Sequence, residues 1–405
     1  MLPADSERPT PEAPAKSPGP APDFVNPLVK WPSIGYGTLP IRRILVVQTQ
    51  RLGDVLCATP LLTALRNQFP LAHLEALVHA PHDALLRENP DLDGVITYDR
   101  QTTHRSLASR LRFIGELRER QFDWALSIHA ASSVAFALWH SGIPWRTCVW
   151  RYGSYRRPHW AHSFHQHVRQ DRRVGHKHEI EHNLDVLREL GIEPRHSGYR
   201  VALRPDERER VRELLRKLGR DESRKLAIVH PGHGGGRQEW ESARYSAVAD
   251  GLAELGYQVV ITGSKGERPL VAGVVYKMKQ HALDLAGAVD LRGLAALLAE
   301  ASCFVSVSTG PMHLASAMGV PAVTLYGPTD LRIESTRFCP YGSPATAVMT
   351  RVPCTCASSR TCANAVCMTG ITPTMVLDAA RQLAGNPADE NLGGEKSQGE
   401  DNGGE

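Results

Sequence analysis

The chain has 405 residues, of which 42% are hydrophobic and 22% are charged, and its formal net charge is +4 at pH 7. This composition is that of an ordinary globular protein, and the length suffices for two cores of typical domain size. This net charge is far smaller than the clustered basic excess that would favour a nucleic-acid partner. It is compatible with an anionic small molecule or a lipid headgroup as substrate.

The two ends of the chain have a composition that differs from the rest. Residues 1–40 are rich in Pro, Ala, Ser and charged residues and contain no apolar run of the kind that a signal peptide or a membrane span needs. We therefore predict a disordered leader over 1–40 and a cytoplasmic protein. Residues 386–405 have a similarly low apolar content, which predicts a disordered acidic tail.

From Ile41 onward, strand-like apolar segments alternate with helical ones. We predict strands at RRILVVQTQ, HLEALVHA, GVITYDR, WALSIHA and RTCVW, and helices at LLTALRNQF, HDALLREN and LASRLRFIGELRERQ. This alternation is typical of a doubly wound parallel sheet and predicts a Rossmann-like domain over 41–200. The helix EIEHNLDVLRELG, ended by Gly191, leads to IEPRHSGYRVALRPDERER, which we interpret as an interdomain connection.

The same alternation restarts in the second half of the chain. Strands are predicted at LAIVHPG, YQVVITGS, CFVSVST and PAVTLYG, separated by helices near ARYSAVADGLAELG, LRGLAALLAEA and PMHLASAMG. The segment 201–385 is therefore predicted to form a second domain of the same α/β class. Two such domains facing each other would leave a cleft at the carboxyl ends of their strands, which is the usual ligand position in open parallel sheets.

The segment CFVSVSTGPMHLASAMG predicts an anion-binding helix start. The strand leads to Thr309 and Gly310, Pro311 suits the first helical position, and Gly319 closes the helix. Thr309 could cap the helix while the amides of its first turn face the cleft and bind a diphosphate. The alternative is a well-made helix start without a ligand, in which His313 is a packed polar residue.

Two further segments follow predicted strands of the second domain. HPGHGGGRQEW contains glycines, Gly234 among them, that would let the backbone approach a ligand, and Arg237 could meet a phosphate; glycine clusters also mark flexible loops. ITGSKGE contains Glu267, which could accept hydrogen bonds from ribose hydroxyls or could be a solvent-exposed carboxylate.

An acidic residue follows the first strand in QTQRLGDVLC. Gly53 turns the chain out of the strand, and Asp54 would face the cleft, where a carboxylate can accept the proton of a hydroxyl nucleophile. Asp54 could instead be the N-cap of a helix. A second candidate helix start, Thr59 with Pro60, would leave Asp54 in a loop.

Taken together, RILVVQTQRLGDVLCATPLLTALR, HPGHGGGRQEW and VSVSTGPMHLASAMGVPAVTLYGPTD resemble glycosyltransferase family 9, the family of ADP-heptose:lipopolysaccharide heptosyltransferases. The resemblance covers about Arg43 to Leu383. It implies a GT-B architecture of two Rossmann-like domains, with the acceptor bound mainly by the first and the nucleotide sugar mainly by the second. It also implies inverting, metal-independent transfer of heptose from ADP-heptose to a hydroxyl of a lipopolysaccharide core or another cell-envelope glycan.

The resemblance also assigns roles to residues. Asp54 falls on the catalytic base, Glu267 on the acid that contacts the ribose, and Thr309, Gly310 and His313 on positions around the donor diphosphate. The predicted donor site further contains Ser308, Pro311, Met312, Gly234, Arg237 and Gln238. The predicted acceptor side contains Arg51, Gly53, Arg156 and Arg157.

The sequence departs from the family pattern at two positions. Gln238 stands where heptosyltransferases typically carry Lys, and Ser308 stands where many carry Asp before Thr-Gly. Arg237 could supply the missing positive charge, although Arg and Lys bind phosphate with different geometry. These departures concern the identity of the donor more than the fold.

Two clusters could bind metal. The histidine-rich stretch between Arg151 and His182 lacks a recognised ligand spacing, so we favour a basic loop that faces the acceptor over a zinc site. Four cysteines lie close together in CTCASSRTCANAVCM; they are Cys354, Cys356, Cys362 and Cys367. They could hold a structural zinc ion or an iron-sulfur centre, or be reduced thiols or a reversible disulfide; none is expected to take part in catalysis.

The sequence also predicts a membrane contact and leaves alternative functions open. Contact with the inner membrane would be peripheral, at its cytoplasmic face, through basic residues such as Arg156, Arg157, Arg172 and Arg173. The alternative functions are a nucleotide-sugar epimerase or hydrolase on the same fold, and a catalytically silent protein that binds a nucleotide sugar. An oxidoreductase is disfavoured because no G-x-G-x-x-G follows the first strand.

Overall fold

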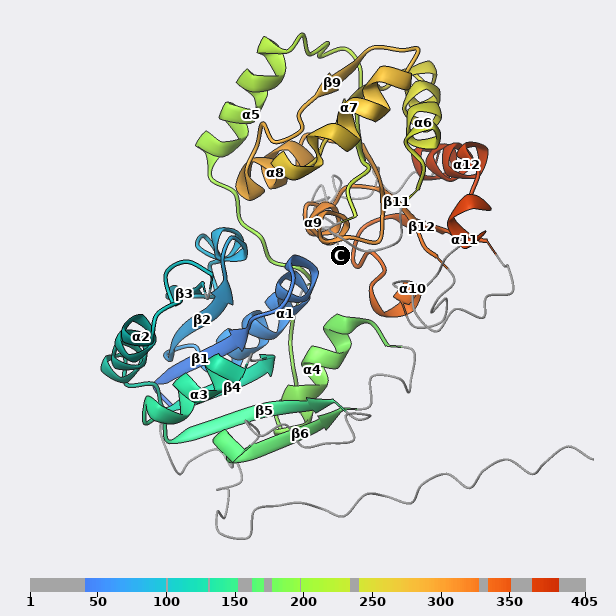
Figure 1. Ribbon diagram of the computed structural model, residues 1–405. Helices are drawn as coiled ribbons and strands as arrows, with labels where there is room; N and C mark the ends of the chain where they lie inside the picture. The colour runs from blue at the N-terminus through green and yellow to red at the C-terminus, as the bar shows by residue number, and fades with distance from the viewer. Residues whose placement is uncertain are drawn as a thin grey trace, which may run out of the picture.

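The chain folds into two parallel sheets that lie one above the other, each covered by helices (Figure 1). The computed structural model describes residues 41–99, 101–129, 132–151, 162–170, 177–196, 198–233, 240–327, 334–350 and 366–385. Within these residues each sheet has six strands, all paired in parallel. The predicted α/β class with two doubly wound domains is confirmed.

The first sheet has the strand order β3-β2-β1-β4-β5-β6. Its strands are β1 (Arg43–Gln48), β2 (His73–His79), β3 (Gly94–Tyr98), β4 (Trp124–His129), β5 (Trp145–Arg151) and β6 (Gln166–Gln170). Its helices are α1 (Leu52–Gln68), α2 (Leu107–Glu119), α3 (Ser132–His140) and α4 (Glu179–Glu189), with a 3₁₀ turn η1 (His82–Leu85). Alternate residues of β1 point to opposite faces, so that Ile44 and Val46 pack with α1 and α4 while Leu45 and Val47 pack with α2 and α3.

The second sheet has the order β12-β11-β10-β7-β8-β9. Its strands are β7 (Leu226–His230), β8 (Gln258–Ile261), β9 (Ala282–Asp284), β10 (Cys303–Val307), β11 (Ala322–Leu325) and β12 (Ala345–Val348). Its helices are α5 (Pro205–Lys217), α6 (Ser242–Glu254), α7 (Arg268–Lys277), α8 (Leu291–Leu298), α9 (Gly310–Ala317), α10 (Glu334–Arg337), α11 (Val366–Thr369) and α12 (Pro373–Ala384), with a 3₁₀ turn η3 (Lys265–Glu267). The core around Tyr245 includes residues of α6, α7 and α12, and the core around Phe304 includes residues of α5, α8 and α9.

Three details differ from the sequence predictions. The segment interpreted wholly as an interdomain connection ends inside α5, which begins at Pro205 and packs on α8 in the second domain. The stretch between Arg151 and His182, expected to be irregular, contains the edge strand β6, and the helix predicted at HDALLREN is only the turn η1. The chain passes from one sheet to the other between α4 and α5, and the domain limits 41–200 and 201–385 stay predictions.

Helix α1 begins earlier than the second of the two predicted starts. Leu52 is its first residue and Arg51 its N-cap, so Pro60 lies inside the helix and the start at Thr59 is wrong. The proline removes the N–H that would donate to the carbonyl of Leu56; the hydroxyl of Thr59 donates to that carbonyl instead, at 2.8 Å. The same hydroxyl oxygen accepts from the backbone N–H of Arg200 at 3.0 Å, which ties the middle of α1 to the connection between the domains.

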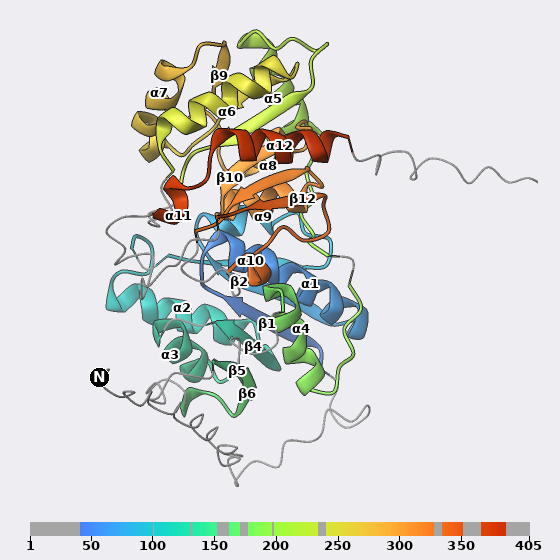
Figure 2. The same ribbon diagram turned by 90° about the vertical axis from the view of Figure 1, so that its right-hand side faces the viewer.

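The two domains meet at the first turns of α1 and α9, which lie next to each other in both views (Figure 1, Figure 2). Leu52 and Leu56 of α1 belong to the same apolar cluster as Met312 and Leu314 of α9. The core of the second domain therefore extends into the first, and the junction between them is apolar.

Candidate active site

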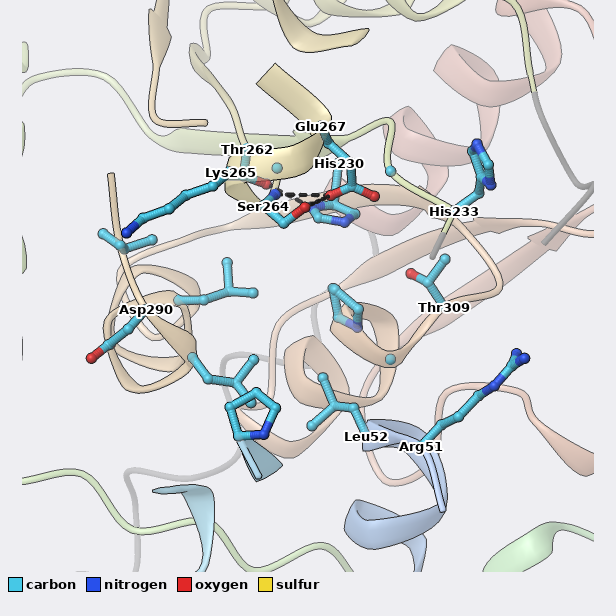
Figure 3. Close-up of a pocket in the computed structure, with 18 of the residues that line it drawn as sticks. Arg51, Leu52, His230, His233, Thr262, Ser264, Lys265, Glu267, Asp290 and Thr309 are labelled. Atoms are coloured by element: carbon cyan, nitrogen blue, oxygen red, sulfur yellow. Dashed lines mark hydrogen bonds between the residues drawn. The ribbon is translucent and has the colours of Figure 1, made fainter. Parts of the chain in front are cut away.

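A cavity of about 810 Å³ lies between the two domains (Figure 3). The second domain forms most of its wall, from the ends of β7, β8 and β10 and from the first turns η3, α8 and α9. The first domain closes it with Arg51 and Leu52 at the start of α1 and with Pro81 and His82 at η1. The position at the carboxyl ends of parallel strands is the one predicted for a ligand.

At one end of the cavity is the start of α9, where Ser308, Thr309, Gly310 and Pro311 line the wall. Thr309 is the N-cap with an extended backbone, but its hydroxyl makes no cap hydrogen bond, so the expected side-chain cap is wrong. The Thr309 hydroxyl oxygen is buried and has no hydrogen-bond partner among the described residues. In the first turn Pro311 has no N–H and the Met312 N–H donates to the carbonyl of Thr309 at 3.1 Å. The groups that could bind an anion at this end of the cavity are therefore the Gly310 N–H, the Thr309 hydroxyl and the positive end of the helix dipole.

At the turn η3, Glu267 lies on the cavity wall with Ser264 and Lys265. Oε2 of Glu267 accepts hydrogen bonds from the backbone N–H and the hydroxyl of Ser264, both at 2.8 Å, which is a capping box. This fixes the carboxylate against Gly232, where any Cβ would overlap its oxygen atoms. The S-x-x-E pattern in the sequence could have predicted this anchor, which our sequence analysis missed.

His230 and Thr262 line the cavity behind Glu267 and were not predicted. The two side chains are hydrogen-bonded to each other, with 3.0 Å between Nδ1 of His230 and Oγ1 of Thr262. Burial lowers the pKa of His230 to about 4, so the imidazole is neutral at pH 7. Both residues lie at the ends of strands, where the sequence predicts the site, so this rule could have identified them. His230 also belongs to the quoted segment HPGHGGGRQEW.

Two of the first-domain residues that line the cavity have ionisable side chains, Arg51 and His82. Arg51, predicted on the acceptor side, lies on the wall next to the α9 end, on the same side as Thr309 and His233 (Figure 3). Arg51 forms no ion pair with any residue in the described ranges. His82 lines the wall from η1, and burial, followed by the neighbouring His79, lowers its pKa.

Asp54 is the third residue of α1 and is half-buried. It does not itself line the cavity, whereas Leu52 of the same helical turn does. Because Arg51 is the N-cap, the alternative that Asp54 caps the helix is wrong. A carboxylate in the first turn of a helix interacts favourably with the helix dipole.

The first turns of α1 and α9 approach closely because each contributes a glycine. A Cβ at Gly53 would lie 2.7 Å from Cδ2 of His313, and a Cβ at Gly310 would lie 2.8 Å from Cβ of Leu52. Both contacts are shorter than side chains allow, so both positions require glycine. Gly53 therefore serves the packing between domains as well as the turn after β1.

Met312 and His313 were predicted at the donor site, but the structure places both in the interior, outside the cavity wall. Nδ1 of His313 is 2.8 Å from the Tyr199 hydroxyl and 3.9 Å from Sγ of Cys57. Burial, with a smaller effect of His178, lowers the pKa of His313 to about 3. This neutral imidazole packs in the protein interior at the start of α9. Direct contact between His313 and a donor stays a prediction.

Cys57, His178 and His313 each offer a ligand atom within 4.8 Å of the others. However, Nδ1 of His178 accepts from the N–H of Ile180 at 3.1 Å, so its Nε2 carries the proton and donates to the carbonyl of Cys339 at 2.9 Å. Burial also raises the pKa of the Cys57 thiol well above its ordinary value. Both ring nitrogens of His178 are thus engaged and the thiol is protonated, so we describe the three as a hydrogen-bonded contact between the domains.

A second contact between the domains is an ion pair between Glu179, at the start of α4, and Arg337 of α10. The distance between Nε and Oε2 is 2.6 Å, and the Glu179 side chain is only 1% exposed. An ion pair buried to this degree is strongly destabilising to break.

Several predicted residues lie outside the described residues. They are Arg156, Arg157, Arg172, Arg173, Gly234, Arg237, Gln238, Cys354, Cys356 and Cys362. Cys367, the remaining member of the cysteine cluster, is buried in α11. The metal site at the cluster, the basic acceptor loop and the compensation of Gln238 by Arg237 therefore stay predictions.

The structure agrees with the sequence motifs. It has two Rossmann-like domains, a cavity at the strand ends of the second domain, and an acid, Asp54, in the first turn of α1. The family model described as glycosyltransferase family 9 (heptosyltransferase) matches residues 110–367. The chain belongs to glycosyltransferase family 9. It is therefore a glycosyltransferase, as its motifs predicted, and the epimerase, hydrolase and silent-binding alternatives are set aside.

Curated relatives agree with this assignment. The chain is 28% identical over 300 residues to a putative glycosyltransferase of Haemophilus influenzae, covering 71% of this chain and 82% of the relative. It is 28% identical over 284 residues to lipopolysaccharide heptosyltransferase 3 of Escherichia coli K12, covering 69% and 80%.

Solved structures confirm the GT-B type of fold. A family 9 glycosyltransferase from Veillonella parvula superposes with a TM-score of 0.76 at 24% identity, over 86% of this chain and 98% of that one. The E. coli ADP-heptose lipopolysaccharide heptosyltransferase II superposes with a TM-score of 0.68 at 22% identity, over 84% and 98%. Among the described residues, no helix combines the length and the apolar character needed to span a bilayer.

Proposed function

We propose that this glycosyltransferase moves heptose from ADP-heptose to a hydroxyl of a lipopolysaccharide-core glycan, with inversion and with Asp54 as the general base. The observation that carries the proposal is the cavity between the domains, which is lined by a fixed acid, a helix start and an arginine. The choice of heptose and of a lipopolysaccharide acceptor is supported by a relative of 28% identity that bears the name lipopolysaccharide heptosyltransferase 3.

The donor would lie along the cavity with its nucleoside at the η3 end. Glu267, held by its capping box, would accept hydrogen bonds from ribose hydroxyls, and Val289, Leu291 and Leu294 would pack against the base. The volume of about 810 Å³ is within the usual range of small-molecule pockets, about 300 to 1,000 Å³.

The diphosphate would lie at the start of α9, next to Arg51. The family's lysine position is Gln238 in this chain, and Arg51 has no ion pair with a described residue, so its guanidinium could bind phosphate oxygens. The Gly310 N–H and the positive end of the α9 dipole add to this field. We therefore reassign Arg51 from the acceptor side to the donor diphosphate.

The chemical step would be a single displacement. The acceptor hydroxyl oxygen attacks the anomeric carbon as its proton passes to Asp54, and the bond from that carbon to the diphosphate oxygen breaks with its electron pair leaving on the nucleotide. Arg51 and the start of α9 would stabilise the developing charge on the diphosphate, in the role that a divalent cation has in other transferases. Attack from the face opposite the leaving group inverts the configuration at the anomeric carbon.

A binding screen tests the proposed donor. Purified protein is heated with ADP-heptose, UDP-, GDP- and dTDP-sugars, because a ligand that binds the folded state raises its apparent stability. We expect a selective rise in melting temperature with ADP-heptose. A selective rise with another nucleotide sugar would refute the donor assignment but keep the fold and the base, and no rise with any would refute the assignment of the cavity as the donor site.

A further inference from the structure

Four large apolar side chains are exposed on two neighbouring helices of the first domain. Leu107 and Leu111 of α2 are 72% and 58% exposed, and Phe136 and Trp139 of α3 are 51% and 53% exposed. We call the surface formed by these four residues the α2–α3 face. Both helices cover the side of the first sheet opposite α1 and α4, and they lie side by side in both views (Figure 1, Figure 2).

The exposed side chains of each helix point the same way. Leu107 and Leu111 are four residues apart and Phe136 and Trp139 three apart, which places each pair on one side of its helix. The opposite sides of α2 and α3 are buried in the cluster that contains Leu45 and Val47 of β1. The α2–α3 face is therefore the surface turned away from the sheet.

The two helices are joined at their C-terminal ends. Nη2 of Arg118 in α2 donates to the carbonyl of His140 in α3 at 2.8 Å. The His140 ring lies 3.9 Å from that of Phe136 and 5.1 Å from that of Trp139, between centroids, so the end of α3 is an exposed aromatic cluster.

The charges around the face have one predominant sign. The segment 105–120 contains five arginines and two glutamates, and α3, with the sequence SSVAFALWH, contains no ionisable side chain except His140. Arg105 and Arg112 are exposed and form no ion pair with another described residue. An apolar surface bordered by arginine is complementary to a layer that is apolar inside and anionic at its surface.

We propose that the α2–α3 face docks the enzyme on an anionic lipid bilayer. Trp139, Phe136 and the two leucines would enter the boundary between headgroups and acyl chains, where tryptophan is enriched, and Arg105 and Arg112 would bind lipid phosphates. A protein partner is disfavoured by the one-sided positive charge.

The docking proposal rests on the proposed function in one respect, because a lipid-linked acceptor would lie at a bilayer. Helices α2 and α3 follow β3 and β4, so they start at the edge of the sheet that faces the cavity. An enzyme docked through this face would keep Leu107, at the start of α2 and at the cavity edge of the sheet, next to the bilayer. The earlier expectation of contact through Arg156, Arg157, Arg172 and Arg173 concerns residues outside the described ranges and stays a separate prediction.

Sedimentation with vesicles tests the docking. The full chain is mixed with vesicles of phosphatidylglycerol and phosphatidylethanolamine, and separately with vesicles of phosphatidylcholine alone. We expect binding to the anionic vesicles, weakening with salt, and little binding to the zwitterionic ones.

Two double variants of the face should then lose affinity for the anionic vesicles. Phe136→Gln with Trp139→Gln should lower the partition coefficient by about tenfold or more. Arg105→Gln with Arg112→Gln, which leaves the packing of both helices unchanged, should lower it by about tenfold or more as well.

Matched controls lie elsewhere on the surface. Leu71→Gln with Tyr276→Gln removes two apolar side chains that are 98% and 89% exposed, and Lys277→Gln with Lys279→Gln removes two exposed charges from the second domain. Both controls should bind the anionic vesicles as the unchanged protein does.

Other outcomes overturn the proposal. Vesicle binding that survives in both face variants, or that falls equally in the controls, assigns docking to another surface. Loss of self-association in the face variants, measured by light scattering without vesicles, would assign the face to a second copy of this chain. Donor binding and transfer to an acceptor stripped of its acyl chains should be unchanged in the face variants, so a failure of the docking and a failure of the proposed function give different results.

Discussion

Replacement of Gly53 by alanine tests whether the first turns of α1 and α9 hold the two domains together. An added Cβ would lie 2.7 Å from Cδ2 and 3.1 Å from Nε2 of His313. The imidazole cannot easily retreat, because its Nδ1 is 2.8 Å from the Tyr199 hydroxyl and its other neighbours are buried. The substitution must therefore separate α1 from α9 or break the hydrogen bond to Tyr199.

The expected size follows from two opposing effects. Alanine in place of glycine inside a helix stabilises by about 1 kcal/mol. Overpacking of a rigid contact costs about 1–3 kcal/mol, and a lost buried hydrogen bond adds about 1 kcal/mol. Because the clash is with a fixed ring, we expect Gly53→Ala to destabilise the protein by about 1–2 kcal/mol net.

Gly115 of α2 gives the matched control, since no atom lies within 4 Å of a Cβ built there. Gly115→Ala should raise the thermal midpoint, whereas Gly53→Ala should lower it and should also slow transfer, because Asp54 is the next residue. If Gly53→Ala were as stable as Gly115→Ala, the proposed tight contact between the first turns would be wrong.

Three further predictions concern charge. Arg51→Gln should weaken nucleotide-sugar binding by about tenfold to a hundredfold in calorimetry, while Lys277→Gln leaves it unchanged; equal affinities would return Arg51 to the acceptor side. The pKa of His313 is lowered to about 3 from 6.5, so the folded state binds fewer protons than the unfolded chain between these values. The stability that depends on the neutral imidazole is complete above pH 6.5 and is lost as the pH falls toward 3. Over this range the free energy of unfolding should change by about 1.4 kcal/mol per pH unit, and His313→Gln should remove this dependence. An unchanged slope in the variant would contradict the buried neutral state. Treatment with EDTA should leave transfer intact, and a loss of activity restored by Mg²⁺ would refute metal-independent chemistry.

The central strands could be predicted from the sequence because each is buried on both faces and reads as a continuous apolar run. The edge strands β6, β9 and β12 lack such runs, as QHVRQ of β6 illustrates, and were missed. Helix α5 was interpreted as part of a connection because PDERERVRELLRK is mostly charged and buries only Glu207, Val211 and Leu215. Its hydrophobic period is too sparse to stand out from a polar linker.

The site could be predicted where a local motif fixes it. The start of α9 and Glu267 follow strands directly, so their place on the cavity wall agrees with the sequence argument. His82 and Arg51 line the cavity because two distant segments meet across the cleft, which no local pattern records. The interior position of His313 likewise depends on the contact with Gly53 and Tyr199, far away in sequence.

The most direct test of the central claim is the rate of sugar transfer by Asp54→Asn in a single turnover with saturating donor. The asparagine keeps the shape of the side chain but cannot accept the acceptor proton. We expect an unchanged dissociation constant for the donor and a transfer rate lower by about a hundredfold or more. Transfer at the rate of the unchanged enzyme would contradict the assignment of Asp54 as the base.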